Sequence, residues 1–393
     1  MRGDTVTQRV ESLKLRGSVH DVQYLFAGIR AILLLKSSAD KEEVIASVRN
    51  EISEYNREFA EKYNLSKPRS IGPSLANDVI AILKSLGIVE VEEQRLRFSP
   101  LGRHLASLLE NSQTREFRNE IAKLMLSKFS QLRSFLVNLY LKTTDGELSL
   151  PKVTAELLEV CKGDAKIMAE KIIEAVSTNL TEIAGSKLSS FELQKRLGSC
   201  LQAIKGKEIK SLEVAADQYL ISNLMGPEIT SERTYDIVRD QCTSMFLVNY
   251  GYFREGVLYS EVVYLTSWLY PEMIPPSNID EFTDLDLGDD KRIRIHEPSS
   301  LAFKARFEEA VSKAYRNERP QFEFVKVSTL RKHVCRNLRI SDRLFDSGIV
   351  ELHQENPDRF SLSYSFEKVT AKRLPILLGD TVKTTYNLIH IKE

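Results

Sequence analysis

The segment from Gly72 to Leu105 constrains the fold more than any other, because it reads as a helix, a tight β-hairpin and a second helix in immediate succession. Pro73 suits the first position of the first helix, where a missing N–H costs nothing, and Gly87 suits its left-handed end. Apolar residues recur between them at the spacing of one helix face. These residues are Leu75, Val79, Ile82, Leu83 and Leu86.

The hairpin and the helix after it are equally well marked. Residues 88–91 and 96–98 alternate between apolar and polar side chains, which predicts two half-buried strands joined by a short turn. Ser99 is a good N-cap and Pro100 a good first helical residue, so the next helix is expected to begin at once.

Two amphipathic helices are predicted upstream, over residues 19–36 and 40–63, and the second begins with a capping box formed by Asp40 and Glu43. The whole order, three helices, a hairpin and a helix, resembles the winged helix-turn-helix. The Ser-Pro-Leu-Gly-Arg run that begins at Ser99 is similar to a pattern of bacterial and archaeal regulators with this fold. The resemblance implies binding rather than catalysis, with either DNA or a protein as the partner.

A second unit of this kind is predicted near the C-terminus. We expect a helix over 327–338, a turn at 339–340 and a second helix over 341–347. Ser341 would cap the second helix and Gly348 would end it. This arrangement is typical of a helix-turn-helix.

Strands are predicted on both sides of these helices. Residues 349–353 and 359–364 alternate as strands with good turn chemistry between them, and 322–325 is a candidate first strand. Over 20–110 and 322–366 the chain therefore resembles the winged-helix superfamily. With such units near both ends, it is also similar to tandem winged-helix proteins that bind the kleisin subunit of chromosome-organising complexes. The resemblance implies, as a class, DNA binding or the bridging of subunits.

Two further segments show a weaker pattern. Residues 234–246 read as a helix followed by a hairpin over 247–265, which is a candidate third wing, and 132–180 is a fourth candidate with a short strand at 147–150. Aromatic side chains crowd the third candidate. They would either stack on single-stranded bases or anchor a partner, or they would simply pack a sheet on helices, which is the commoner case. These residues are Tyr250, Tyr252, Tyr259, Tyr264, Trp268 and Tyr270.

The length of 393 residues suggests several domains, and the patterns predict an α+β fold that is predominantly helical. Multiple winged-helix domains would be joined by a helical middle region. The expected domains are a winged helix over 1–111, a helical domain over 112–227, an α+β domain over 228–319 and a winged helix over 320–393. Further helices are predicted over 115–142, 164–180, 189–206 and 212–225. The acidic, Pro-rich stretch over 271–290 is expected to be a surface loop or linker.

Composition narrows the setting. The net charge of zero argues against a protein that coats nucleic acid by bulk charge. No apolar run is long enough to span a membrane and no signal segment opens the chain, so a cytoplasmic protein is expected. Four scattered cysteines without CxxC spacing are expected to be reduced, and they are Cys161, Cys200, Cys242 and Cys335.

The sequence offers little chemistry. It contains no phosphate-binding loop, no GxSxG elbow and no histidine or cysteine pair at metal-ligand spacing. The acidic cluster over 284–290 lacks the glycine and the closing glutamate of a calcium loop. We therefore expect a non-enzymatic protein with no cofactor and no bound metal. A metal-dependent nuclease would need clustered carboxylates that the sequence does not display.

The candidate DNA contacts fall in two places. In the C-terminal unit, basic side chains crowd a short stretch opposed only by Asp342, and a solvated basic face is expected to bind phosphates without carrying stability. These residues are Arg331, Lys332, Arg336, Arg339 and Arg343. In the first unit the candidates are Lys67, Arg69, Ser74, Asn77, Lys84, Arg95 and Arg97. Glu90, Glu92 and Glu93 in the same wing favour a protein partner instead.

The sequence thus predicts a non-enzymatic DNA-binding protein, acting as an accessory subunit of a larger complex for antiviral defence, repair or segregation. Its partners would be double-stranded DNA and other protein subunits, and the sequence is also compatible with a homodimer. The alternatives are an adaptor whose winged helices contact protein only, and a transcription regulator. The basic helix around Arg336 favours DNA, whereas the acidic first wing favours protein.

Overall fold

The structure is a computed structural model that is mostly helical with small antiparallel sheets, which confirms the α+β class. None of its described helices combines the length and the apolar character needed to cross a membrane. Apart from a few isolated residues between 191 and 229, it describes residues 19–35, 39–63, 65, 67–92, 95–143, 146–177, 231–266, 279–288, 291–298, 300–318, 324–364, 376–377 and 385–392. The predicted helices over 189–206 and 212–225, together with Cys200, Trp268 and Tyr270, lie outside or almost wholly outside these residues.

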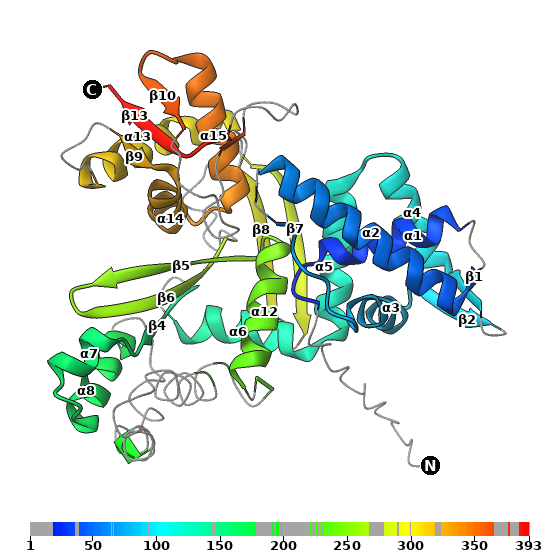
Figure 1. Cartoon of the computed structure of the whole chain (residues 1–393), viewed down its shortest axis with the longest axis horizontal. Helices are drawn as coiled ribbons and strands as arrows, with labels where there is room; N and C mark the ends of the chain where they lie inside the picture. Colours follow the sequence, from blue (N-terminus) through cyan, green and yellow to red (C-terminus); the bar gives the residue numbers. More distant parts are fainter. Residues whose placement is uncertain are drawn as a thin grey trace, which may run out of the picture.

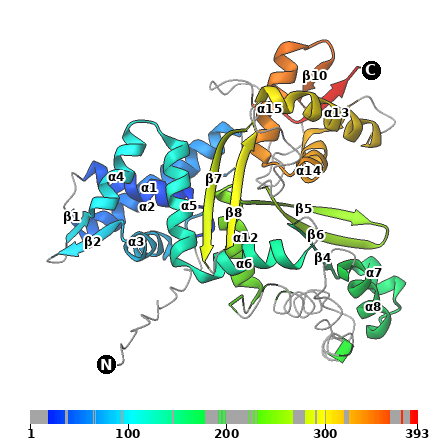
Figure 2. The ribbon, with the colours of Figure 1, turned by 180° about the vertical axis from the view of Figure 1, so that it is seen from behind.

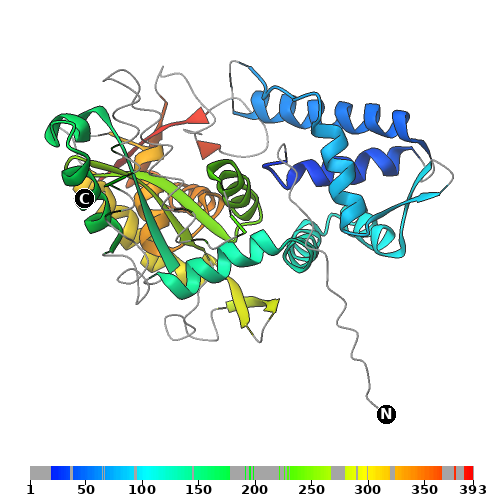
Figure 3. The ribbon, with the colours of Figure 1, turned by 90° about the horizontal axis from the view of Figure 1, so that it is seen from below.

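The first unit follows the predicted order and stands to one side of the molecule (Figures 1 and 3). Its strands form an antiparallel sheet in the order β1-β3-β2. Its elements are α1 (Gln23–Leu34), β1 (Ala39–Asp40), α2 (Lys41–Lys62), α3 (Leu75–Ser85), β2 (Val89–Glu92), β3 (Arg95–Phe98) and α4 (Pro100–Glu110).

Gly87 and Ser99 mark their boundaries as predicted, but Pro73 lies before α3, which begins at Leu75 with Ser74 as its N-cap. Gly87 has a φ of 73°, so a side chain there would be strained, and it follows Leu86, the C-cap of α3. Ser99 Oγ accepts a hydrogen bond from the Gly102 N–H at 3.0 Å and caps α4. A Cβ on Gly102 would lie 2.1 Å from the carbonyl oxygen of Ile88, so α4 packs on the hairpin only because this residue is glycine.

The second unit unites the third and fourth candidate wings in one sheet. Strand β4 pairs along its whole length with β6, and the sheet order is β4-β6-β5. Its elements are α6 (Ser130–Lys142), β4 (Glu147–Lys152), α7 (Ala155–Val160), α8 (Ala165–Ser177), α12 (Glu232–Ser244), β5 (Val248–Glu255) and β6 (Leu258–Leu265). Helix α5 (Thr114–Lys128) leads into it from the first unit, and the expected single helix over 115–142 is interrupted at Phe129.

The third unit lies beyond a β-hairpin formed by β7 (Ile279–Gly288) and β8 (Lys291–Pro298). Figure 2 shows this hairpin beside α5, so the expectation of a loop over 271–290 is wrong for its described part. The elements of the third unit are α13 (Ser300–Glu318), β9 (Val325–Lys326), α14 (Val327–Leu338), α15 (Asp342–Glu355), β10 (Phe360–Ser363), β11 (Ile376–Leu377), β12 (Thr385–Tyr386) and β13 (Leu388–Ile391). Its three-stranded sheet has the order β10-β13-β9.

The prediction that Gly348 ends a helix and begins a hairpin is wrong. Helix α15 continues through it, and the predicted strand over 349–353 is helical. A Cβ on Gly348 would lie 2.6 Å from the ring of Phe307, so this glycine permits a close approach of α13 and α15. Strand β10, within the predicted 359–364, pairs instead with the distant β13.

The three-stranded sheets of the described residues, one in each unit, share one topology. In each, the strand that comes first in the sequence pairs with the last strand, which also pairs with the middle one. One hydrophobic core serves the first two units, and a second core serves the third unit together with Phe253, Val262 and Tyr264. Strand pairing therefore crosses the expected boundary near 227, and α13 packs with α14 and α15 across the one near 319.

Candidate functional site

The predicted basic face on α14 is turned towards the second unit. Arg336 donates hydrogen bonds from Nε and Nη2 to Glu147 Oε1, at 3.1 and 2.6 Å. Arg339 donates from Nη1 to Glu147 Oε2 at 2.6 Å. Glu147 is the first residue of β4, and its side chain is only 10% exposed. One carboxylate of the second unit thus pairs with two arginines of the third.

Aromatic rings complete this contact. The guanidinium of Arg336 lies 4.6 Å from the centre of the Phe253 ring, and that of Arg339 lies 5.4 Å from the centre of the Tyr264 ring. Lys332 Nζ lies 5.5 Å from the centre of the Phe253 ring. Burial by itself would raise the pKa of Glu147, but the hydrogen bonds and charges of the two arginines outweigh it and lower the pKa.

The two remaining arginines among the C-terminal DNA-contact candidates differ in burial. Arg331 is buried and donates from Nε and Nη2 to Asp346 Oδ1 at 2.8 and 2.6 Å. Burial raises the pKa of Asp346 to about 7, even though Arg331 opposes the shift. Arg343 is exposed at the start of α15. The expectation of one solvated basic face is therefore wrong, because Arg331, Arg336 and Arg339 are held by carboxylates of the same chain.

The candidates of the first unit are all exposed, and they are Lys67, Arg69, Ser74, Asn77, Lys84, Arg95 and Arg97. Two of them have acidic partners. Arg97 forms ion pairs with Glu90 and Glu92 on the neighbouring strand. Arg69 lies 3.6 Å from Asp21 and stacks on the ring of Phe59. Glu93 lies outside the described residues.

A groove of about 600 Å³ separates the outward face of α3 from the sheet of the first unit. Apolar side chains contribute much of its lining, and Asn77, Lys41 and Lys84 also face it. The apolar residues are Ile80, Ala81, Val91 and Leu96, and the carboxylates are Asp40, Glu42 and Asp78.

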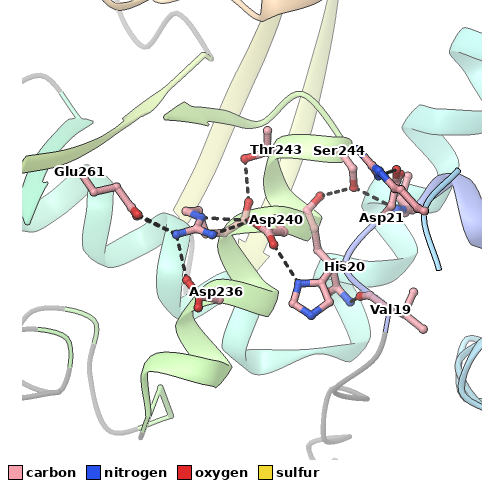
Figure 4. A network of polar contacts seen from close by, with 12 residues as sticks. Val19, His20, Asp21, Asp236, Asp240, Thr243, Ser244 and Glu261 are labelled. Atoms are coloured by element: carbon pink, nitrogen blue, oxygen red, sulfur yellow. Dashed lines mark hydrogen bonds and ion pairs between the residues drawn. The ribbon is translucent and has the colours of Figure 1, made fainter. Parts of the chain in front are cut away.

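A buried charge network ties the start of the chain's described part to the second unit (Figure 4). Arg239 of α12 donates from Nη1 to both oxygens of Glu261 at 2.8 and 2.9 Å, and it also pairs with Asp236 and Asp240. His20 Nδ1 lies 2.8 Å from Asp240 Oδ2. Burial by itself would lower the pKa of Arg239, but the charge of Glu261 outweighs it and raises the pKa.

This network borders a cleft of about 1020 Å³ to which all three units contribute. Arg69 of the first unit and Arg343 of the third both line it, although they are far apart in the sequence. Lys62 and His20 line the cleft as well, but the carboxylates outnumber the basic side chains, so its charge does not favour phosphate. The carboxylates are Asp21, Asp240, Asp342, Asp346 and Glu351.

No protein-family model matches this chain, and neither does any curated protein or solved structure. The described residues also contain no group of three or more His, Cys, Asp or Glu side chains placed to hold a metal ion. The cysteines within them, Cys161, Cys242 and Cys335, are buried and free, as expected.

Sequence reasoning missed the residues that organise this region. Glu147 and Glu261 gave no signal, because each is a single carboxylate in an ordinary strand and its arginine partner lies in another element. The tyrosines divide between two roles. Tyr264 is buried in the core, whereas Tyr252 and Tyr259 stack on one another at 5.9 Å on the outer part of the hairpin.

Proposed function

We propose that this chain is a non-enzymatic adaptor that binds protein partners through winged-helix units. The shared topology of the three sheets supports this interpretation, since each follows the strand order of a winged helix. The units would hold partners in a fixed arrangement, because the first two share a core and the third contacts the second through Glu147.

One observation carries the choice of protein over DNA. Helix α14 is the strongest DNA candidate in the sequence, but its arginines form ion pairs with carboxylates of the same chain. Among the described residues, the groove beside α3 and the cleft between the units are both poor surfaces for a phosphate backbone. Four apolar side chains line the groove beside α3, together with three carboxylates against two lysines, and acidic side chains also outnumber basic ones in the cleft.

DNA binding by the first unit is the second candidate. It is supported by the exposure of Asn77 and Lys84 on α3 and of Ser74, its N-cap, with Lys67 and Arg69 before that helix. Such residues read base edges and hold phosphates in a helix-turn-helix.

Fluorescence anisotropy with a labelled, mixed-sequence duplex separates the two proposals. The adaptor is expected to show no saturable binding in the micromolar range, at either about 50 or about 200 mM salt. Micromolar binding that weakens steeply with salt, and that Lys84→Glu abolishes, would overturn the adaptor in favour of DNA.

A further inference from the structure

The outer edge of β2 is open. This strand ends the sheet order β1-β3-β2, and within the part of the chain that the structure describes no other strand pairs with its outer side. Figures 1 and 3 show its hairpin at the periphery of the molecule. The backbone groups of such an edge are a ready template for an added strand.

The side chains of β2 specify what that strand would carry. Across the existing ladder, Glu90 lies opposite Arg97, Glu92 opposite Arg95 and Val91 opposite Leu96. The inner neighbour of β2 therefore alternates basic and apolar residues. Because side chains of a strand alternate between faces, the two glutamates share one face and Val91 lies on the other.

Val91 and its cross-strand neighbour Leu96 lie on the same face of the sheet, but Val91 is exposed and Leu96 is buried. Val91 is 48% exposed, whereas Leu96, directly opposite on β3, is 2% exposed. Val91 also lines the groove beside α3, together with Ile80 and Ala81. A strand added at the outer edge would place an apolar side chain beside Val91 and into this groove.

We infer that the outer edge of β2 binds an extended segment of a partner protein in which basic residues alternate with apolar ones. The basic residues lie opposite Glu90 and Glu92, and an apolar residue lies opposite Val91. This inference rests on the adaptor function proposed above and names the partner's chemistry.

Charge excludes the competing occupants. A second copy of the chain, pairing β2 with β2, would bring glutamates of the two copies into register, and like charges directly opposite destabilise a sheet. Nucleic acid would meet the same two carboxylates. Opposite charges across strands stabilise the pairing, so the edge selects a basic strand.

The first test is a short fluorescein-labelled peptide that carries Arg-Leu-Arg-Phe twice, copied from β3. Two control peptides accompany it, one with glutamate for arginine and one with proline for leucine. The proline peptide keeps the charge but loses backbone donors. We expect saturable binding of the first peptide and at least about tenfold weaker binding of both controls. Equal binding of the proline peptide would mean charge attraction without strand pairing and would overturn the inference.

A charge-exchange variant sharpens the test. Glu90→Arg and Glu92→Arg combined with Arg95→Glu and Arg97→Glu keeps opposite charges across the hairpin but reverses the charge at its edge. It is expected to prefer the glutamate peptide, whereas Glu61→Arg, an exposed reversal on α2, should leave the original preference unchanged. Retention of the original preference by the exchange variant would contradict the inference.

Hydrogen exchange of the unaltered protein provides a measurement that does not depend on the variant's folding. Amides within 89–92 should become protected when the basic peptide binds, and unchanged exchange at saturation would overturn the inference. The duplex assay judges the proposed function separately. If the protein binds neither the peptide nor the duplex, only the inference about β2 is overturned. If it binds the duplex through α3, both that inference and the proposed adaptor function are overturned.

Discussion

Glu147 is expected to hold the third unit on the second, and Glu147→Ala tests this directly. Its carboxylate accepts hydrogen bonds from Arg336 and Arg339 at distances down to 2.6 Å. The substitution leaves both guanidinium groups without their shared acidic partner, while the ring of Phe253 stays beneath Arg336.

The expected loss follows from burial. Removing one partner of a fully buried ion pair costs about 3–5 kcal/mol, because the other charge stays uncompensated. Here Arg336 and Arg339 are 28% and 26% exposed, so water partly solvates the freed charges. We therefore expect a loss of about 2–3 kcal/mol in the free energy of unfolding.

Urea unfolding followed by far-UV circular dichroism measures this loss. Phe253, Val262 and Tyr264 of the second unit belong to the core of the third, so the two units are expected to unfold together. At a urea dependence of about 2 kcal/mol/M, the midpoint should fall by roughly 1 M.

The matched control is Glu255→Ala. This carboxylate lies 3.8 Å from Arg336 but is 76% exposed, so its loss should change the free energy of unfolding by less than about 0.5 kcal/mol. If the two variants lost the same stability, the argument that Glu147 organises the interface would be refuted.

Three further outcomes are expected. Because the pKa of Glu147 is lowered in the folded state, its stabilisation is complete above its unfolded pKa of about 4.3 and is lost as pH falls through the lower folded value; acid unfolding of Glu147→Gln should lack this component. Asp346 has a folded pKa raised to about 7, so stability should decline as pH rises from about 4 to 7, and in Asp346→Asn this slope should be flatter. Gly348→Ala should lower stability by about 1–3 kcal/mol in thermal unfolding because its Cβ meets Phe307, whereas Gly72→Ala, with open space around it, should not; equal melting temperatures would contradict the close helix approach.

The same geometry changes what removal of the basic side chains means. Arg336→Ala with Arg339→Ala should weaken the contact between units through the loss of both partners of Glu147. A solvated basic face, as the sequence predicts, would instead leave the fold intact in this variant. If this variant binds a ligand more weakly than the unaltered protein, its urea unfolding must be measured as well, to separate lost contacts from lost stability. Unchanged urea unfolding would contradict the role of the two arginines in the contact and would support a solvated basic face.

The sequence by itself determined the first unit almost completely. Helix α3, the hairpin and the start of α4 follow from an apolar stripe, Gly87 and Ser99, and all lie within about ten residues of the signals that define them. Helix α14 was equally local and occupies the predicted 327–338. Short-range patterns suffice here because capping and amphipathic spacing act along a single element.

Tertiary structure alone decided the rest. Gly348 permits either a helix end or a close helix contact, and only the position of Phe307 selects the second. The pairing of β4 with β6 joins residues that are more than a hundred positions apart, and the partner of β10 lies beyond a long intervening segment. Glu147 meets Arg336 only after both units have folded. Charge pairing and backbone approach between distant elements depend on which faces come together in space, and no local pattern along the chain encodes that choice.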